Sequence, residues 1–484
     1  MNAGLADRIL GHAERRPHAP ALTSDGVMLS YADLRQAVDA AQARWRARGL
    51  SAGDSLGWLG WNRVAMLVDL LACERLGARL APLNWRLSAS ELARIGAHAN
   101  LQQLHVDESV GELGRALQAL LALPQPRAVG HEPGDLLLVY TSGSTGEPKG
   151  VVHPSSALLA NIAAAVDAQS LSERTRVLST LPLFHVGGLC IQTLPVLAVG
   201  GEVVLHARFD ADAWLRDVGR LRPTCSLLVP AAMRALVEHP DWDATDLSSL
   251  VFVNSGSSVV PPALIERFHA RAIPVARVYG ATETGPVSVV IRAAEAMAST
   301  ISGGHPALGV ELRLLDEQGV EVAHGAVGEI VLRAPNLMRC YHRQTPAQSL
   351  PGGWFSTGDL GREDALGRVA VVGRSKDMII SGGENIYPAE IENLFADDAN
   401  LAEVAVIGLP DPRWGEVPVL VVVPRDGFAV DSAAIMARLA QNLARYKLPR
   451  RIEVIDALPR TALGKVQKPL LVERLHSLDQ PDTP

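Results

Sequence analysis

In the first 130 residues, segments with the helical spacing of apolar residues alternate with short apolar runs typical of strands. Between Tyr31 and Gly49, residues Leu34, Val38 and Ala41 share one side of a helix, and Gly49 is its expected end. Short apolar runs predict buried strands. The other elements expected here are strands at residues 55–61 and 78–83 and helices at 62–77 and from 88. Alternation of strand and helix implies a mostly parallel sheet with helices on its faces.

The same alternation continues from residue 136 to residue 279. The predicted elements are strands at 136–140, 176–181, 227–230, 250–254 and 275–279 and a helix at 155–168. Several of these strands run into loops of glycine, serine and threonine, where the backbone can approach a ligand closely. Open α/β sheets bind ligands at the carboxyl ends of their strands, so these loops are the expected place for a site.

The pattern changes after residue 309. Residues 309–333 alternate over short runs with turns between them, which predicts a small antiparallel sheet or barrel. Charged residues, a double glycine and a helix that starts at Pro388 follow, and we expect a domain boundary between residues 375 and 376. The C-terminal segment has enough elements for a small α/β domain: strands at 402–408 and 417–423 and helices at 388–392 and 432–443. From Ser477 we expect a disordered tail.

One loop is dense in candidate ligands for phosphate. Tyr140 ends an apolar strand and is followed by Thr-Ser-Gly-Ser-Thr-Gly-Glu-Pro-Lys-Gly at residues 141–150. Its hydroxyls and successive N–H groups suit an anion, and Lys149 adds a cation, so this stretch predicts a polyphosphate site. It is not a Walker loop, which needs Gly-Lys-Ser/Thr leading straight into a helix. The competing interpretation is a polar surface loop between two strands.

Two further strand ends carry residues with candidate chemistry. His185 lies between an aromatic residue and two glycines; it either lines an acyl or aryl pocket or is satisfied by a loop carbonyl. Tyr279 could stack on a planar base, and Thr282 could bond a phosphate. Glu283 could hold Mg²⁺, which prefers carboxylate and phosphate oxygens, or could be a solvated turn acid.

The last third of the chain adds two candidates. Asp359 lies in a tight turn and could accept both hydroxyls of a ribose, although an ordinary turn aspartate has the same pattern. Lys465 lies on a glycine-bearing loop and could be a mobile cation delivered to a site. Considered without the rest of the chain, this segment favours the interpretation of Lys465 as an ordinary solvated surface lysine.

Composition and charge narrow the class of protein. At 484 residues the chain is too long for one compact core. The net charge is −7 with acids and bases mixed, so no basic block marks a nucleic-acid binder. The first 17 residues predict no signal peptide, and the most apolar window, 189–205, is interrupted by polar residues, proline and glycine and predicts no membrane-spanning helix. Four separated cysteines form no metal or redox pair and suggest reduced thiols in a cytoplasmic protein: Cys73, Cys190, Cys225 and Cys340.

Together these stretches resemble the motifs of the adenylate-forming superfamily, in its acyl-CoA synthetase branch. The matching segments follow the family's order over nearly the whole chain: the phosphate loop at 140–150, the acyl-pocket motif at 181–188, the adenine and Mg²⁺ motif at 279–285, the ribose motif at 356–361, the hinge motif at 374–392 and the catalytic-lysine motif at 459–468.

The fold implied by the resemblance is α/β. A large N-terminal AMP-binding domain, residues 1–375, has two mainly parallel sheets flanked by helices and a β-rich, barrel-like subdomain at about 305–375. A small mobile α/β domain, residues 376–484, carries the catalytic lysine.

The implied reaction has two steps. A carboxylate attacks the α-phosphate of ATP to give acyl-AMP and pyrophosphate, and the thiol of coenzyme A then displaces AMP to give a thioester. Mg²⁺ is the implied cofactor, and a small carboxylic acid, ATP and coenzyme A are the implied substrates. The resemblance is also compatible with a homodimer.

Residue roles carry over by position within the motifs. Those implied for ATP are Thr141, Ser142, Gly143, Ser144, Thr145, Gly146, Lys149, Gly256, Ser257, Ser258, Tyr279, Gly280, Ala281, Thr282, Asp359, Arg374 and Lys465. The implied catalytic residues are Lys465, Thr282, Glu283, which is also the metal ligand, and His185. The residues implied for the acyl pocket are His185, Val186, Gly187, Asn254 and Gly280. Those implied for binding coenzyme A are Ser381, Gly382, Gly383 and Glu384. Lys376 is the implied hinge residue.

The resemblance leaves three functions to separate. An acid–coenzyme A ligase is favoured by the Ile-Ser-Gly-Gly-Glu-Asn sequence at 380–385. The alternatives are a free-standing adenylation enzyme that loads a carrier protein and a non-catalytic nucleotide-binding homologue. An uncharged pocket favours an aryl or a medium- to long-chain acid, with o-succinylbenzoate as an alternative. Two positions depart from the family: Gly256-Ser257-Ser258 replaces the common Gly-Ala-Pro, and Lys376 stands where aspartate is common.

Overall fold

The computed structural model describes residues 4–126, 131–141, 149–256, 260–298, 303–344, 349–350, 352–381, 384–396, 398–411, 413–460 and 466–479. The chain forms two compact units: unit 1 is Met1–Leu312 with Val331–Thr357, and unit 2 is Arg313–Ile330 with Gly358–Pro484. The chain passes between them within strands β15 (Glu311–Leu315), β16 (Val327–Arg333) and β19 (Trp354–Glu363). The domain boundary expected between residues 375 and 376 is placed at a hinge between moving domains, and it stays a prediction.

The larger sheet of unit 1 has nine strands in the order β14-β13-β12-β11-β10-β8-β9-β1-β2. They are β1 (Pro20–Ser24), β2 (Val27–Ser30), β8 (Arg176–Ser179), β9 (Glu202–Leu205), β10 (Cys225–Leu228), β11 (Phe252–Ser255), β12 (Val275–Tyr279), β13 (Val289–Ile291) and β14 (His305–Pro306). Pairing is parallel from β12 through to β1. It is antiparallel at both edges.

The second sheet of unit 1 has six strands in the order β17-β7-β6-β4-β3-β5. They are β3 (Ser55–Leu59), β4 (Arg79–Leu83), β5 (Leu101–Val106), β6 (Asp135–Thr141), β7 (Lys149–Pro154) and β17 (Cys340–Tyr341). Strands β5, β3, β4 and β6 are parallel, whereas β6, β7 and β17 are antiparallel. The expectation of two mainly parallel sheets is therefore confirmed.

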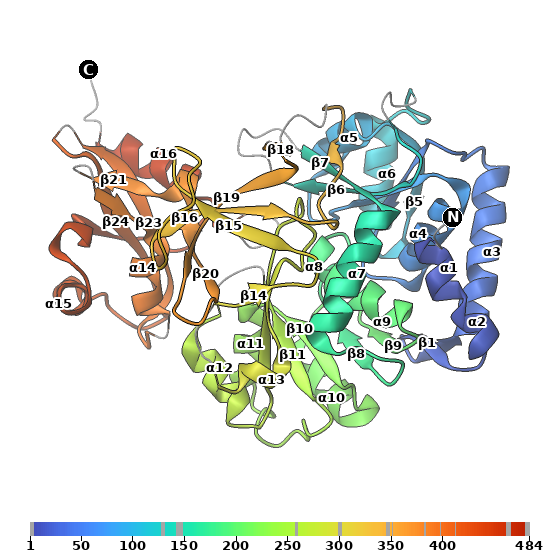
Figure 1. Cartoon of the computed structure of the whole chain (residues 1–484), viewed down its shortest axis with the longest axis horizontal. Helices are drawn as coiled ribbons and strands as arrows, with labels where there is room; N and C mark the ends of the chain where they lie inside the picture. Colours follow the sequence, from blue (N-terminus) through green and yellow to red (C-terminus); the bar gives the residue numbers. More distant parts are fainter. Residues whose placement is uncertain are drawn as a thin grey trace. The chain divides into compact units, whose positions relative to one another are not determined.

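Helices cover both sheets of unit 1 (Figure 1). They are α1 (Leu5–Leu10), α2 (His12–Arg15), α3 (Tyr31–Ala47), α4 (Val64–Leu76), α5 (Ala89–His98), α6 (Gly111–Leu120), α7 (Ser155–Gln169), α8 (Val186–Gly188), α9 (Leu194–Ala198), α10 (Ala211–Leu221), α11 (Pro230–Val237), α12 (Pro262–His269) and α13 (Ala293–Ala296). The largest apolar cluster joins α1, α3, α4, α7 and α9 to strands of both sheets. Helices α10–α12 cover the other face of the nine-stranded sheet, and α5 and α6 that of the six-stranded sheet.

Local signals explain where these helices begin and end. Ser30 and Asp33 form a capping box at the start of α3, and Gly49 follows its end in the left-handed region at φ 86°. Helix α4 begins at Val64, two residues later than predicted, because the side chain of Asn62 is used elsewhere. Its amide donates to the carbonyl of Leu181 at 2.9 Å, and its oxygen accepts the N–H of Leu183 at 2.8 Å.

A third sheet contains the strands predicted by the alternation after residue 309. Its order is β15-β16-β19-β18, with β20 (Val369–Arg374) paired with β19 and β18 at Ser349–Leu350. Among the described strands this order is open, so the antiparallel sheet, and not the barrel, is the form that the model supports. Strands β18, β19 and β20 pair antiparallel.

The remaining part of unit 2 is a sheet between two apolar clusters. Its order is β22-β21-β24-β23, with β25 paired with β24. The elements are β21 (Ile379–Ser381), β22 (Glu384–Ile386), β23 (Leu401–Asp411), β24 (Gly415–Pro424), β25 (Arg451–Val454), α14 (Pro388–Glu392), α15 (Ser432–Asn442) and α16 (Lys468–Asp479). Helices α14 and α15 cover one face and α16 the other. The prediction of a disordered tail from Ser477 is wrong for residues 477–479, because the buried residues Leu471 and Leu475 hold a helix that continues to Asp479.

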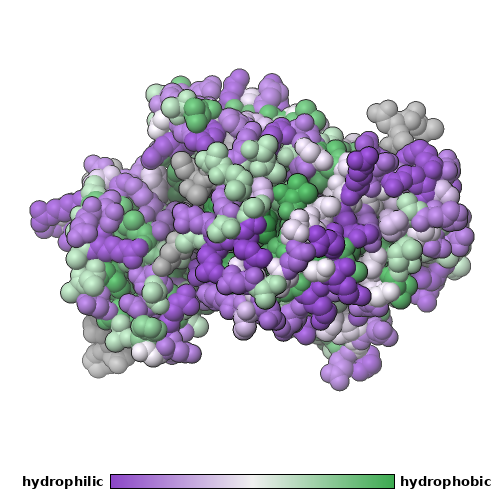
Figure 2. Space-filling view, turned by 90° about the horizontal axis from the view of Figure 1, so that it is seen from below, coloured by the Kyte–Doolittle hydropathy of each residue, from purple (hydrophilic) through white to green (hydrophobic). Residues whose placement is uncertain are grey.

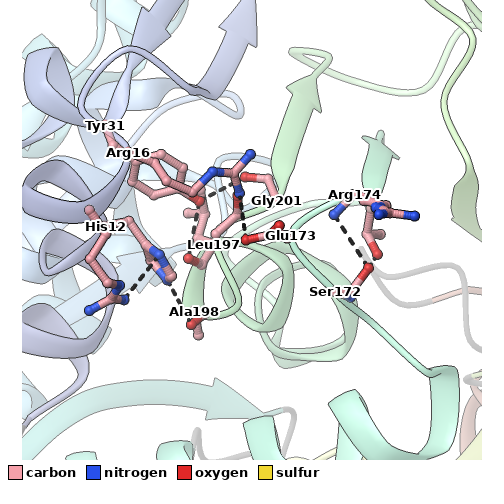
Figure 3. A network of polar contacts seen from close by, with 12 residues as sticks. His12, Arg16, Tyr31, Ser172, Glu173, Arg174, Leu197, Ala198 and Gly201 are labelled. Carbon is pink, nitrogen blue, oxygen red and sulfur yellow. Dashed lines mark hydrogen bonds and ion pairs between the residues drawn. The ribbon is translucent and has the colours of Figure 1, made fainter.

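The first 31 residues hold the chain that follows the acyl-pocket motif (Figure 3). His12 Nε2 lies 3.1 Å from the carbonyl of Ala198, and the Tyr31 hydroxyl donates to the carbonyls of Gly201 at 2.7 Å and Leu197 at 3.1 Å. Burial lowers the pKa of His12 and raises that of Tyr31, so both side chains are neutral in this network. The end of α9 is thereby satisfied by side chains from the N-terminal segment.

Among the described residues, no helix has both the length and the apolar character that crossing a bilayer requires. Hydrophilic residues cover much of the face shown in Figure 2, with apolar residues in smaller patches.

Removing the Tyr31 hydroxyl tests the N-terminal network. Tyr31→Phe is expected to lower the free energy of unfolding by about 1–3 kcal/mol, because two buried carbonyls lose a donor. Urea denaturation measures this change. The matched control is Tyr446→Phe, since Tyr446 is 45% exposed, and it should change the free energy by less than about 0.5 kcal/mol. Equal effects of the two substitutions would contradict the assignment.

Acid should destabilise the protein through buried histidines. Burial in β7 lowers the pKa of His153 from 6.5 to about 4. Between these two values the unfolded chain binds a proton here that the folded chain does not bind, so the free energy of unfolding falls as the pH falls. His153→Gln should give a flatter dependence in urea titrations across this window. His342, whose pKa burial also lowers, acts in the same direction in both proteins, so the difference between them isolates His153.

Candidate active site

The predicted phosphate loop connects two neighbouring antiparallel strands. Strand β6 ends at Thr141 and β7 begins at Lys149, and these residues lie opposite each other in the sheet. One residue earlier, the hydroxyl of Tyr140 lies 2.7 Å from Nδ1 of His98. The structure thus places both ends of the loop. The predicted ligands between them lie outside the described residues: Ser142, Gly143, Ser144, Thr145 and Gly146.

Tyr341 links the two charged residues predicted to act on the phosphates. Its hydroxyl donates to Oε1 of Glu283 at 2.9 Å, and Nζ of Lys149 lies 5.2 Å from the centroid of its ring. Burial raises the pKa of Tyr341, and the Glu283 carboxylate raises it further, so the hydroxyl stays a donor. The predicted phosphate clamp and the predicted metal ligand are therefore neighbours on either side of one tyrosine.

Sequence reasoning missed Tyr341 because it lies on a two-residue strand with no motif around it. The position of this strand is set by Arg339, whose Nε and Nη2 donate to the two carboxylate oxygens of Asp135 at 2.8 and 2.6 Å. The backbone N–H of Arg339 also donates to the carbonyl of Val152 at 2.9 Å. Since β17 pairs with β7, this contact places Tyr341 beside the start of β7.

The loop after β12 is folded tightly around Thr282 and Glu283. The N–H of Ala281 donates to the hydroxyl of Thr284 at 2.9 Å, and the N–H of Met338 donates to the carbonyl of Glu283 at 2.7 Å. Gly280 has no room for a Cβ, which would lie 2.6 Å from the carbonyl oxygen of Pro286. Tyr279 ends the strand and is partly exposed, as stacking on a base requires. This geometry holds Glu283 in place beside Tyr341.

His153 supports this loop from the six-stranded sheet, and sequence reasoning missed it as well. Its ring faces the backbone of Thr282, which partly offsets the lowering of its pKa by burial. Thr282 itself is buried. The phosphate-loop hairpin and the Thr282 loop are therefore in direct contact.

The acyl-pocket motif begins with a histidine cap. Nδ1 of His185 accepts the N–H of Gly187 at 3.1 Å, so the ring closes the first turn of α8. Val186 and Gly187 are buried beside it. This backbone N–H is one partner of the ring, and the choice between a pocket residue and a loop-bonded histidine stays a prediction. The role of these three residues in an acyl pocket stays a prediction.

A π-helix, η2 (Leu189–Thr193), follows directly, and α7 supplies side chains to its carbonyls. Asn161 donates to the carbonyl of Cys190 at 2.7 Å, and Gln169 donates to that of Ile191 at 2.9 Å. The oxygen of Asn161 accepts the N–H of Val287 at 3.2 Å, which joins the acyl-pocket segment to the loop after β12. Single turns of π-helix occur frequently at functional sites.

Asn254, the last residue but one of β11, has an unused acceptor. It pairs with Ala276, whose side chain lies in the cluster between the two sheets, and paired residues of parallel strands share a face. Its Oδ1 is buried and has no hydrogen-bond partner among the described residues. Gly256 follows, and a Cβ there would lie 2.7 Å from the carbonyl oxygen of Val278. Its predicted neighbours Ser257 and Ser258 lie outside the described residues.

Unit 2 contains the predicted ribose pair. Asp359 and Arg374 lie opposite each other on β19 and β20, with Nε of Arg374 3.2 Å from Oδ1 of Asp359. The carboxylate is largely buried and the guanidinium is about half exposed. Lys376 follows in a single 3₁₀ turn, η3 (Ser375–Asp377), and is exposed. The positions of Asp359 and Arg374 suit contact with a ligand hydroxyl. The exposed position of Lys376 suits a solvent-accessible hinge.

The two remaining predicted groups of unit 2 are described only in part. Ser381 and Glu384 pair at the end of the β21–β22 hairpin, with Glu384 exposed. Gly382, Gly383 and Lys465 lie outside the described residues. The predicted site residues therefore fall into two sets, one in each unit. Within unit 1 the structure brings Lys149, Glu283 and the Thr282 loop together.

Two family models match the chain. One, described as AMP-binding enzyme, matches residues 10–342, and the other, AMP-binding enzyme C-terminal domain, matches residues 390–465. The chain is 42% identical over 493 residues to an indoleacetate–CoA ligase from Aromatoleum aromaticum, covering 96% of each chain. It is 40% identical over 481 residues to a feruloyl-CoA synthase from Amycolatopsis sp, covering 96% of this chain and 98% of that one.

A solved structure agrees with this match. ATP-bound MatB from Rhodopseudomonas palustris superimposes with a TM-score of 0.89 at 28% sequence identity, over 99% of this chain and 100% of that one. The α/β fold and the superfamily expected from the motifs are thereby confirmed. The chain belongs to the AMP-binding enzyme family.

Proposed function

We propose that this protein is an ATP-dependent acid–coenzyme A ligase that forms acyl-AMP with release of pyrophosphate and then transfers the acyl group to coenzyme A. The observation that carries the proposal is the placement of Lys149, Tyr341 and Glu283 around the ends of the phosphate loop. Family membership and relatives that are coenzyme A ligases over nearly the whole chain support it. A cytoplasmic location and a homodimer stay predictions.

The carboxylate of Glu283 suits Mg²⁺ bound in the way that nucleotide-binding enzymes hold it. This ion is usually held by one or two carboxylates together with substrate phosphates. Among the described residues no group of three or more histidine, cysteine or acidic side chains forms a metal cage. Glu283 would hold the ion together with phosphate oxygens, and Tyr341 would orient its carboxylate. When bound, Mg²⁺ neutralises charge on the transferring group.

Lys465 is the proposed catalytic cation. A carboxylate anion approaching an α-phosphate crowds negative charge in the transition state, and a cation offsets that charge. A cation about 4 Å from an anion contributes roughly 4 kcal/mol at an effective dielectric constant near 20. Loss of that contribution corresponds to about a thousandfold in rate. Lys149, by contrast, acts on the leaving pyrophosphate as a clamp and positions the α-phosphorus.

An aryl acid is the proposed substrate class. The two relatives most similar in the comparisons described above are named for indoleacetate and ferulate, whose rings carry N–H or O–H groups. The buried acceptor of Asn254 suits such a donor, because an acceptor left unpaired in a dry pocket is unfavourable. A medium- or long-chain acid and o-succinylbenzoate remain the alternatives in the test.

A panel of carboxylic acids tests the function. The assay follows AMP release in the presence of ATP, Mg²⁺ and coenzyme A, and counts free thiol in parallel. Aryl acids should give equal amounts of AMP and thioester. AMP release that needs a carrier protein instead of coenzyme A would favour the carrier-loading alternative. Absence of pyrophosphate exchange with every acid would overturn the assignment as an adenylating enzyme.

Substitution of the proposed catalytic lysine separates the two half-reactions. Lys465→Ala should lower acid-dependent pyrophosphate exchange about a thousandfold or more, because the cation that offsets the developing charge is lost. Thioester formation from supplied acyl-AMP should stay within about threefold of the wild type, since that step does not use this cation. Equal losses in both half-reactions would contradict this role.

Tyr341→Phe tests the link between Lys149 and Glu283. Removing a hydroxyl that donates to a carboxylate should lower kcat/KM for pyrophosphate exchange about tenfold to hundredfold. The Mg²⁺ concentration for half-maximal exchange should rise as well, because the Glu283 carboxylate loses its orienting partner. Tyr446→Phe, at an exposed position of unit 2, is the control and should change neither value. An unchanged Mg²⁺ dependence in Tyr341→Phe would argue against Glu283 as the metal ligand.

A further inference from the structure

Lysine is rare in this chain and is confined to a few places. Only 5 of the 45 basic residues are lysine, and they are Lys149, Lys376, Lys447, Lys465 and Lys468. Three of them have proposed roles in the phosphate loop, the hinge and catalysis. The other two each pair with a glutamate of the short helix α14: Lys447 with Glu390 and Lys468 with Glu392.

The Lys468–Glu392 pair lies at the start of α16, three residues after Lys465. Nζ of Lys468 donates to Oε1 of Glu392 at 2.7 Å, and the same oxygen accepts the N–H of Val406 at 2.8 Å. The two side chains are 20% and 24% exposed, so the pair is largely shielded from water. One carboxylate thus ties the start of α16 to α14 and to β23.

The residues on both sides of the segment 461–465 are tied together. Arg460 and Val466 form an antiparallel bridge, and the backbone N–H of Gln467 donates to the carbonyl of Pro459 at 2.8 Å. The side chain of Gln467 donates to the carbonyl of Arg460, also at 2.8 Å. Arg460 in turn pairs with Glu403 on β23 at 2.8 Å. The residues that flank the segment 461–465, which lies outside the described residues, are therefore joined to each other and to β23.

Helix α16 is held both by apolar packing and by its first residue, Lys468. Leu471 and Leu475 are buried in the cluster on this face of the sheet. Lys468 and Pro469 of the first turn, with Val472 and Glu473 of the next, line a hollow of about 590 Å³ together with the segment from Lys376 to Ile379. The ion pair between Lys468 and Glu392 therefore adds a polar restraint on the direction of the first turn to the apolar contacts of its neighbours.

We propose that Lys468 and Glu392 are positioning residues for the catalytic lysine: their ion pair orients the base of the segment that carries Lys465. The inference rests on the proposed role of Lys465 in adenylation. A misplacement of about 1 Å in a catalytic group can cost about a hundredfold in rate, so the loss of this restraint should appear in the chemical step.

Two substitutions and their combination test the proposal. Lys468→Met and Glu392→Gln should each lower kcat for acid-dependent pyrophosphate exchange about tenfold to hundredfold, with KM for ATP within about twofold of the wild type. The double variant should be no slower than Lys468→Met, because both changes remove one interaction. Glu392→Gln keeps an acceptor for the N–H of Val406, so it remains informative if Lys468→Met folds poorly.

The matched control is the other lysine pair on the same helix. Nζ of Lys447 lies 2.6 and 2.7 Å from the two carboxylate oxygens of Glu390, and its side chain is 16% exposed. Lys447→Met removes an ion pair of the same kind from α14 without touching the base of the Lys465 segment. It should lower Tm about as much as Lys468→Met and leave kcat for exchange within about twofold.

Thioester formation from supplied acyl-AMP separates positioning from general damage. Lys468→Met should retain this half-reaction within about threefold, whereas a loss equal to that in exchange would overturn the proposal. Equal exchange rates for Lys447→Met and Lys468→Met would overturn it too. Lys465→Ala is run beside them: if it abolishes exchange while Lys468→Met does not affect it, the positioning role fails and the proposed function stands. Full exchange in Lys465→Ala would instead remove the proposed role of Lys465.

Discussion

Antiparallel pairing of β6, β7 and β17 is the constraint on which the candidate site in unit 1 depends. It sets Thr141 opposite Lys149 at the two ends of the phosphate loop and brings Tyr341 beside them. The bidentate pair between Arg339 and Asp135 keeps β17 in this position, with the carboxylate fully buried. Such a pair contributes through its fixed geometry more than through net stability, because removing the charges from water offsets most of their attraction.

The proposed function needs an anion beside Lys149 and a metal ion beside Glu283. Lys149 offers a cation over the ring of Tyr341, Glu283 offers an anion bonded to its hydroxyl, and the loop that carries Glu283 is closely packed at Gly280. Phosphate oxygens complement the first and a divalent cation complements the second. Asn254 offers a buried acceptor that lacks a partner among the described residues.

In unit 2 the proposed function needs one cation, Lys465, to be directed to the reacting group. Lysine has a long side chain with several rotatable bonds, and its entropy opposes any one position. The structure restrains the backbone on both sides of Lys465 by a bridge, two hydrogen bonds from Gln467 and the ion pairs of Arg460 and Lys468. The asparagine and glutamine of α7 act similarly in unit 1, where they hold the π-helix after the acyl-pocket motif. Polar side chains thus add directed contacts at both segments.

The amino-acid sequence by itself determined the family and much of the order of strands and helices, and it supplied the candidate site residues, whose roles stay predictions. It could do so because local patterns of a few residues predict strand β12, helix α14 and the glycine- and hydroxyl-rich loops. Gly49 and the capping box at Ser30 are local signals of the same kind. Only the tertiary structure identified Tyr341, His153, Asn161 and the Lys468–Glu392 pair. These are ordinary residue types in ordinary segments, and their roles come from contacts between segments 58, 126 or 76 residues apart, as for Tyr341–Glu283, Asn161–Val287 and Lys468–Glu392. No local pattern encodes such contacts, because they exist only once the sheets have paired.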